Sequence, residues 1–241
     1  MSYARPGYSG STRHRGRRVA DAAVDVAAVL DALGVDEFVS IGHSGGGPHA
    51  IACAALLPDR CRAVATIGGV APADLVGGSW TDGMAEENIA EFAAAAAGEG
   101  VLRPHLEAEL ARFVSVTPAE VARAFGGLVT EVDRDALTDD YADMTARSLR
   151  RAAFDGLDGW VDDDLAVLAP WGVDLGEVVR PVALWQGRHD AMVPYAHGTW
   201  LAHHVAHAHP RLHDDEGHLS LVNGRIAEVV DDLLELASLG L

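Results

Sequence analysis

A serine within a glycine-rich turn is the first residue whose surroundings point to chemistry. Gly42, His43, Ser44, Gly45 and Gly46 form the pattern G-x-S-x-G, with a strand-like run before it and a helix-like run after it. This pattern is typical of a nucleophile elbow, in which a strained turn exposes the serine hydroxyl. Glycine at 42 and 46 relieves a clash across the turn, and the Gly45 N–H is placed to stabilise an oxyanion. We therefore predict Ser44 as a nucleophile.

Such a serine needs a histidine and a carboxylate, because its hydroxyl is weakly nucleophilic until a histidine accepts its proton and a carboxylate orients that histidine. Asp190 follows the apolar run PVALWQG, and His218 lies in the segment DDEGHLSL after the last short apolar run. Both are expected in loops that follow strands. The predicted catalytic triad is therefore Ser44, Asp190 and His218.

The same residues have alternative interpretations. Ser44 could be only the N-cap of the following helix, and Asp190 could be only a turn residue. The run from Gly45 to Ala50 also fits a dinucleotide-binding pattern, but the next apolar run, 62–67, is followed by Gly-Gly-Val-Ala and not by an acidic residue. A P-loop requires a lysine, and the chain has none. A phosphate-binding loop is thus disfavoured.

Histidines and cysteines elsewhere are interpreted as structural. His203 and His207 are spaced as on one turn of a predicted helix and could share a metal ion, but no third ligand lies at a metal-binding spacing. We expect a solvated helix face there and no metal. Cys53 and Cys61 are expected to be buried free thiols.

The composition restricts the possible partners. The 241 residues carry a formal net charge of −18, which repels phosphate backbones and disfavours nucleic acid. No apolar run approaches the roughly 18 residues that span a bilayer, and the basic, glycine-rich start lacks the apolar segment of a secretion signal. We expect a soluble, cytoplasmic protein that binds neither nucleic acid nor membrane.

Apolar patterning predicts the elements that position the site. Helical spacing over 17–33 precedes a strand over 36–41, and a second strand over 62–67 follows the glycine turn and its helix. Parallel strands separated by helices indicate an α/β fold with a doubly wound sheet. The later predicted elements are a strand at 181–187, a helix at 196–208, a strand at 211–213 and a helix at 224–236.

A helical segment interrupts the strand pattern. We predict a core formed by 1–71 and 180–241, with 72–179 inserted as a helical cap over the site. The predicted cap helices cover 84–97, 101–114, 118–125 and 134–154. Candidates for an apolar pocket lining, or equally for ordinary core, are Trp80, Phe92, Trp160 and Trp171.

Several segments together resemble the capped members of the α/β-hydrolase fold superfamily. The resemblance is carried by RPGYSGST, GHSGGGPHA, DDDLAVLAPWGVDL, PVALWQGRHDAMVP and EGHLSL, and it extends over most of the chain. It implies Ser44 as nucleophile, Asp190 as acid, His218 as base and Gly45 as an oxyanion donor, with no metal or organic cofactor. Serine at the turn implies cleavage of an ester, lactone, amide or peptide bond in a small molecule through an acyl-enzyme.

The sequence departs from this family at its N-terminal end. Family members carry about four strands before the RPGYSGS segment and a His-Gly motif that supplies a second oxyanion donor, whereas this chain starts at that segment. We expect an N-terminally truncated fold in which the strand at 36–41 is an open apolar edge that promotes self-association. Loss of one oxyanion donor lowers rates about 10²–10³-fold. A weakly active or non-catalytic ligand-binding protein is therefore the alternative function.

Overall fold

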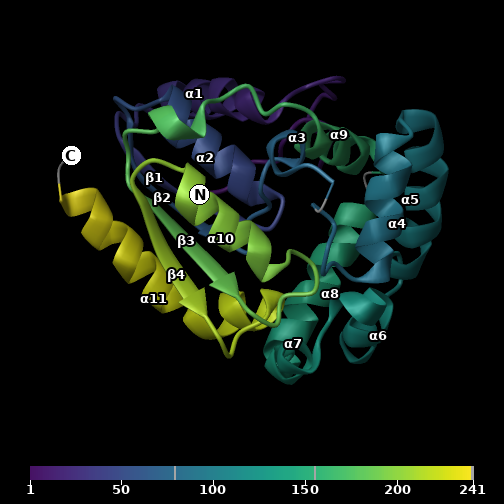
Figure 1. The fold of residues 1–241 in the computed structure, drawn as a ribbon. Coiled ribbons are helices and arrows are strands. Elements are labelled where there is room, and N and C mark those ends of the chain that lie inside the picture. Colours follow the sequence, from purple (N-terminus) through teal and green to yellow (C-terminus); the bar gives the residue numbers. More distant parts are fainter. Residues whose placement is uncertain (79, 155, 240–241) are drawn as a thin grey trace.

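Four parallel strands form one sheet (Figure 1). The structure is a computed structural model that describes residues 1–78, 80–154 and 156–239. The strands lie side by side in chain order, each hydrogen-bonded to the next. Their bounds are β1 (Phe38–His43), β2 (Cys61–Ile67), β3 (Val182–Gly187) and β4 (Ala208–His213). The predicted α/β class with a parallel sheet is confirmed.

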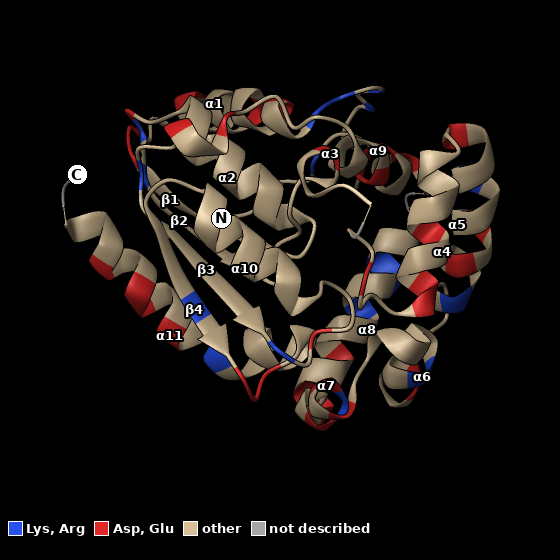
Figure 2. Ribbon diagram, viewed as in Figure 1, with Lys and Arg blue, Asp and Glu red and all other residues tan. Residues whose placement is uncertain are grey.

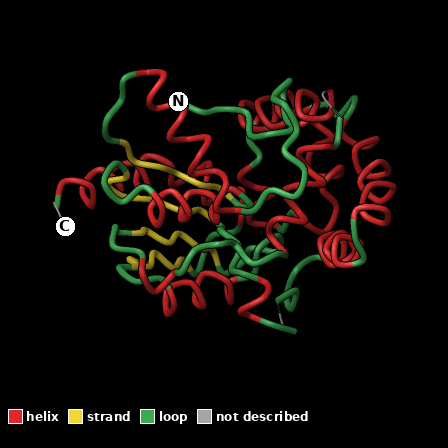
Figure 3. Tube along the Cα trace, turned by 90° about the horizontal axis from the view of Figure 1, so that it is seen from above, coloured by secondary structure: helices red, strands yellow, loops and turns green. Residues whose placement is uncertain are grey.

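Helices cover both faces of this sheet (Figure 3). They are α1 (Ala22–Leu33, after the 3-10 turn η1, Val19–Asp21), α2 (Gly46–Leu56), α10 (Tyr195–His204) and α11 (His218–Ser238). On one face α2 and α10 pack against the strands, with α1 behind α2, while α11 packs on the other face. Within β2, Val64 belongs to the first of these cores and Ala63 and Ala65 to the second. Because both faces of the two central strands are buried, β2 and β3 read as largely apolar runs.

Two helix boundaries differ from the sequence-based expectation. The last helix begins at His218 and not near 224, so the predicted placement of His218 in a loop was wrong. The helix predicted over 196–208 ends at His204, and β4 starts already at Ala208. His203 and His207 therefore do not share a helix face, which removes the basis for a shared metal site. A Gly34 in the left-handed conformation (φ 64°) ends α1 as predicted.

No strand lies between β2 and β3 in the described residues, as predicted. The helices of this segment are α3 (Ala73–Val76), α4 (Glu86–Ala96), α5 (Glu99–Phe113), α6 (Val121–Phe125), α7 (Glu131–Ala136), α8 (Asp139–Phe154) and α9 (Asp158–Leu168). The segment also contains the 3-10 turns η2 (Pro118–Glu120), η3 (Gly126–Leu128) and η4 (Leu175–Glu177). Helices α4 to α9 are called the cap helices below. The single helix predicted over 134–154 is broken at Leu137, whose ψ of 63° leaves the helical region. Helix α9 was not predicted, because three consecutive aspartates obscure its apolar spacing.

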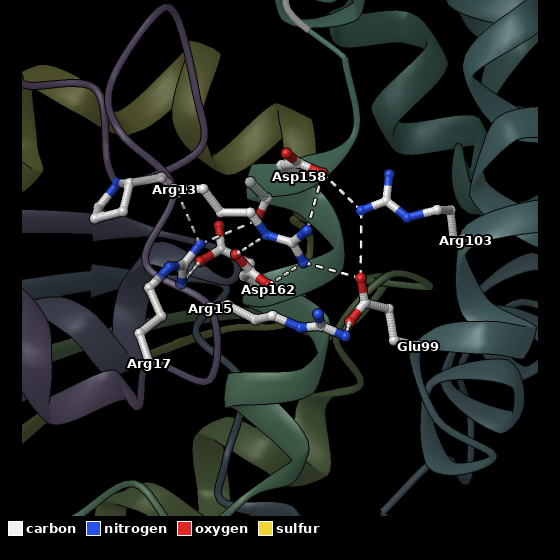
Figure 4. Close-up of polar contacts among 10 residues, drawn as sticks. Arg13, Arg15, Arg17, Glu99, Arg103, Asp158 and Asp162 are labelled. Carbon is white, nitrogen blue, oxygen red and sulfur yellow. Dashed lines mark hydrogen bonds and ion pairs between the residues drawn. The ribbon is translucent and has the colours of Figure 1, made fainter.

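An ion-pair network ties the N-terminal segment to the cap helices (Figure 4). The Arg13 guanidinium donates to both oxygens of Asp162 on α9, at 2.9 and 2.7 Å, and to Glu99 on α5 at 3.1 Å. Arg103 on α5 reaches back to Asp158 on α9 at 2.6 Å. Because the Asp162 side chain is almost fully buried, its charge requires the Arg13 guanidinium as a partner. The basic start of the chain thus holds α5 and α9 together.

Strand β1 forms one edge of the sheet, as expected. Within the described chain it pairs only with β2, and Ile41 on it is 41 % exposed. Beside it lies a groove of about 560 Å³ lined by β1, by apolar residues of α1 and by the first residues of the chain. Acidic residues are distributed over many helices (Figure 2). None of the described helices is both long and apolar enough to cross a bilayer.

Candidate active site

Ser44 occupies a strained turn between β1 and α2. Its φ of 54° lies in the left-handed region that residues with a side chain rarely adopt. The Ser44 N–H donates to the Ile67 carbonyl on β2 at 2.8 Å, which holds the turn against the neighbouring strand. A Cβ at Gly42 would collide with the carbonyl of Gly46 and lie 2.9 Å from Ala50 Cβ. The turn therefore requires glycine at position 42.

The other glycines of the turn are under different constraints. A Cβ at Gly46 would meet nothing within 4 Å, so the clash expected for a side chain at this position is absent. A Cβ at Gly47 would approach Gly69 Cα to 2.8 Å, because α2 packs closely on the end of β2. Gly45 has open space around it, and its N–H makes no hydrogen bond within the described residues. That N–H is free to bind an oxyanion.

Asp190 and His218 form a buried hydrogen-bonded pair. The His218 Nδ1–H donates to Asp190 Oδ2 at 2.7 Å, the tautomer being assigned from the carboxylate partner. The other oxygen, Oδ1, accepts from the backbone N–H groups of Met192 at 2.9 Å and Val193 at 2.7 Å. Gln186 on β3 also donates to Oδ2, at 3.1 Å. These bonds direct one oxygen of Asp190 at the imidazole.

The surroundings of His218 favour its protonated form. Burial alone lowers the pKa of this imidazole, but the adjacent Asp190 carboxylate and, further away, Asp133 outweigh burial and raise the pKa above its ordinary value. The space around the pair is tight, because a Cβ at Gly68 would lie 2.7 Å from His218 Nδ1 and 3.1 Å from Asp190 Oδ2. The carboxylates of Asp190 and Asp133 therefore stabilise the imidazolium that forms when His218 accepts a proton.

Asp133 determines where the helix that carries His218 begins. Its fully buried carboxylate accepts hydrogen bonds from the backbone N–H groups of Leu219 at 2.8 Å and Ser220 at 3.0 Å. Gly217 permits this approach, because a Cβ there would lie 2.7 Å from Asp133 Cγ. Sequence reasoning missed Asp133, since its spacing from Thr130 is that of a residue in the first turn of its own helix. No local signal connects it to a helix 86 residues away.

The three predicted triad residues follow β1, β3 and β4, so all lie beyond the carboxyl ends of the strands. Ligands of open α/β sheets bind at this edge. The ring of His43, beside Ser44, lies 4.6 Å from the ring of His218, measured between centroids. The Ser44 hydroxyl makes no hydrogen bond to His218 or to any other described residue. It remains available to a ligand.

A cavity of about 240 Å³ opens onto Ser44 and Gly45. Of the four aromatic residues predicted as possible lining, Phe92 and Trp160 line it. Trp80 and Trp171 instead belong to the sheet core, where their indole N–H groups donate to backbone carbonyls. The remaining lining residues are Tyr8, Val70, Asn88, Glu91, Asp163, Asp164, Val167, Met192 and Val193. The acidic residues among them were not predicted.

Cys53 and Cys61 are free and buried, as predicted. Burial raises the pKa of the Cys53 thiol to about 11, and burial together with Cys53 raises that of Cys61 to about 12. Both thiols are therefore protonated and unreactive at neutral pH.

The sequence and the fold of this chain are similar to those of known proteins. Residues 3–224 match a family model described as alpha/beta hydrolase fold. The structure resembles an esterase from Thermogutta terrifontis in its malate-bound form, with a TM-score of 0.61 and 17% identity over 96% of this chain and 77% of that one. It also resembles an esterase from a Rhodococcus species (TM-score 0.61, 20% identity, 98% and 78% covered) and an enol-lactonase from Burkholderia xenovorans (0.63, 20%, 95% and 78%). No curated protein sequence matches.

Proposed function

Because the chain belongs to the α/β-hydrolase fold family, we propose that it is a serine hydrolase that cleaves a small acyl substrate through a covalent acyl-enzyme. The observation that carries the proposal is the buried hydrogen bond of 2.7 Å from His218 to Asp190, at the same edge of the sheet as a serine held at a φ of 54°. A buried carboxylate that orients an imidazole, combined with a half-buried serine hydroxyl on a strained turn, is the arrangement of a charge-stabilised general base and its nucleophile.

In the first step Ser44 Oγ attacks the carbonyl carbon of the substrate. The hydroxyl proton passes to Nε2 of His218, since Nδ1 already donates to Asp190. The Asp190 carboxylate stabilises the imidazolium that forms. The tetrahedral intermediate carries a negative oxygen, to which the free N–H of Gly45 donates at the N-terminal end of α2.

Collapse of the intermediate releases the leaving group, which takes the proton from His218. Water then enters, His218 removes its proton, and attack on the acyl-enzyme releases the carboxylic acid and regenerates Ser44. Proton and charge balance require no metal or organic cofactor at any step.

The size and position of the cavity support a small substrate. A volume of about 240 Å³ is below the roughly 300–1,000 Å³ of sites for drug-sized ligands. Among the proteins that share the fold, two are named esterases and one is named an enol-lactonase, so their names refer to ester and lactone bonds. The class of bond proposed here is therefore an ester, lactone or amide.

A fluorophosphonate probe tests the proposal, because an activated serine displaces its fluoride and becomes phosphonylated, whereas an ordinary serine does not react. We expect the full chain to be labelled, Ser44→Ala to lose all labelling, and Ser115→Ala, which alters an exposed serine of the cap, to be labelled like the wild type. A correctly folded wild-type chain that takes up no probe would contradict the activated serine and would support the alternative, a non-catalytic ligand-binding protein.

A further inference from the structure

The cavity at Ser44 contains carboxyl groups and no basic side chain among the described residues that line it. Three acids reach it: Glu91 from α4, and Asp163 and Asp164 from α9. The chain has no lysine, and its nearest arginines approach α9 from the N-terminal segment. Apart from the Tyr8 phenol, carboxyl groups are thus the ionisable side chains that line the site among the described residues.

The carboxylate of Asp163 already has hydrogen-bond donors from the N-terminal segment. It accepts hydrogen bonds from Arg5, from Arg17 at 2.5 Å and from the Tyr8 hydroxyl at 2.8 Å. Burial alone would raise the pKa of this carboxyl, but Arg5, then His49 and Arg17, hold it below the ordinary value. Asp163 is therefore an ionised, neutralised anchor for the N-terminal segment and has no charge left for a ligand.

Asp164 has no such partner. It is 7 % exposed, and its buried Oδ2 has no hydrogen-bond donor among the described residues. The half-buried Glu91 lines the same cavity, and the two carboxyl groups interact through charge and hydrogen bonding. Glu91 also accepts from the Trp160 indole N–H at 2.9 Å. Asp164 thus lines the Ser44 cavity with a carboxyl group that no basic side chain of the described residues neutralises.

The pair carries a large electrostatic penalty when both groups are ionised. Burial first, and then the charge of Glu91, raise the pKa of Asp164 well above its ordinary value. Burial also raises the pKa of Glu91, while Trp160, Asp164 and His105 oppose that effect. Without a cation, a proton shared by the two groups is therefore favoured over two ionised carboxylates. A cation that enters the cavity replaces this proton and permits both carboxylates to ionise.

We propose that Glu91 and Asp164 bind the protonated amine of the acyl substrate that Ser44 attacks. This inference rests on the proposed function and specifies its substrate class: esters or amides with an ammonium group close to the scissile carbonyl. An ammonium group has three N–H donors and matches the two carboxylates in charge and in hydrogen bonding.

The walls of the site agree with an ammonium ligand. Tyr8, Phe92 and Trp160 line the cavity, and aromatic faces attract cations. A second, mainly apolar cavity of about 340 Å³ within the cap shares Tyr8, Asn88, Glu91 and Trp160 with the first. An apolar part of the substrate therefore has space beyond the carboxyl pair.

Binding of a simple amine tests the inference without any catalysis. On the Ser44→Ala chain, titration calorimetry with n-butylamine hydrochloride is compared with butan-1-ol, which has the same length and no charge. We expect saturable binding of the amine, with the alcohol at least 10-fold weaker, and loss of amine binding in chains that also carry Asp164→Asn or Glu91→Gln. Equal binding of amine and alcohol, or unchanged amine binding in both variants, overturns the inference.

Kinetics on a matched substrate pair provide the second test. L-alanine p-nitroanilide and isobutyryl p-nitroanilide differ only in an ammonium group replaced by a methyl group. We expect the wild type to prefer the first by at least 10-fold in kcat/KM, and Asp164→Asn or Glu91→Gln to reduce this ratio toward one. Glu86→Gln, which removes the same charge from an exposed position of α4, should keep the wild-type ratio.

The two tests separate failure of this inference from failure of the proposed function. A chain that binds fluorophosphonate and hydrolyses isobutyryl p-nitroanilide as well as the alanine substrate is a serine hydrolase without amine recognition. A chain that binds n-butylamine through Glu91 and Asp164 but takes up no fluorophosphonate recognises amines and is not a serine hydrolase. Thermal melting of each variant confirms that its fold is retained.

Discussion

Asp133 accepts a 2.8 Å hydrogen bond from the backbone N–H of Leu219, the residue that follows His218. Asp133 lies in the cap helices, whereas Leu219 lies in the first turn of the helix that covers the far face of the sheet. The start of a helix has N–H groups without internal partners, and a carboxylate there satisfies them and interacts favourably with the helix dipole. The proposed base is therefore positioned by a residue of the cap.

Removal of this carboxylate is expected to affect both stability and reactivity. Asp133→Ala leaves the buried N–H groups of Leu219 and Ser220 unpaired, which costs about 1–3 kcal/mol. Asp133→Asn retains one acceptor oxygen and should lose less. Urea unfolding provides the free energies, and the rate of fluorophosphonate labelling reports on His218. If Asp133→Ala unfolds like the wild type and is labelled at the same rate, Asp133 does not position the base.

The pH dependence of hydrolysis follows from the raised pKa of His218. The imidazole must be neutral to accept the serine proton, so activity should rise with pH through an apparent pKa above the ordinary value of 6.5. Asp190→Asn should shift this limb to lower pH and reduce kcat by about 10³–10⁴-fold, since the orienting charge is lost. A pH–rate profile of kcat/KM measures both effects. An apparent pKa below 6.5 in the wild type would be inconsistent with the Asp190 interaction.

The raised pKa of His218 also makes the stability of the folded chain depend on pH. A group whose pKa is raised on folding stabilises the native state below its unfolded pKa, and this stabilisation is lost as pH rises through the folded pKa. The His218 and Asp190 pair should thus contribute its full stabilisation at mildly acidic pH and less at alkaline pH. The comparison of wild type with His218→Ala in urea unfolding at pH 6 and pH 9 should show a larger difference at pH 6.

The two glycines that flank the turn should respond differently to alanine. Gly42→Ala places a Cβ against the Gly46 carbonyl, which cannot move without disrupting the turn, and overpacking of this kind costs about 1–3 kcal/mol. Gly46→Ala meets no atom within 4 Å and should be tolerated. Thermal unfolding of the two variants measures the contrast. Equal melting temperatures would argue against a crowded turn.

The open edge of β1 should mediate self-association. Strand β1 exposes unpaired backbone groups and Ile41 next to an apolar groove, and such edges pair with other chains. We expect concentration-dependent oligomers in size-exclusion chromatography, and we expect Ile41→Lys, which adds a charge at the edge, to reduce them. The exposed apolar residue Val230 of α11 lies on the other side of the sheet, so Val230→Lys serves as the control. A wild type that elutes as a clean monomer would refute this role of the edge.

Local signals were sufficient to predict the turn and the strands. The apolar runs before Ser44 and Asp190 are both parallel strands. The second of them, β3, is buried on both faces, and burial of this kind leaves a largely apolar run in the sequence. The left-handed φ of Ser44 and the crowding at Gly42 are properties of five adjacent residues. The sequence alone therefore determined the parallel arrangement of the strands and the turn of the candidate nucleophile, and it provided the order of the proposed triad residues.

Only the tertiary structure distinguished acids that look alike in sequence. Asp163 and Asp164 are neighbours in one run of aspartates, yet the first is neutralised by Arg5 and Arg17 and the second is buried opposite Glu91. Asp133 likewise caps a helix 86 residues away and extends it back to His218. Charge and hydrogen bonding act through space, so the partner of a buried carboxylate is decided by packing between distant segments, which no local pattern encodes.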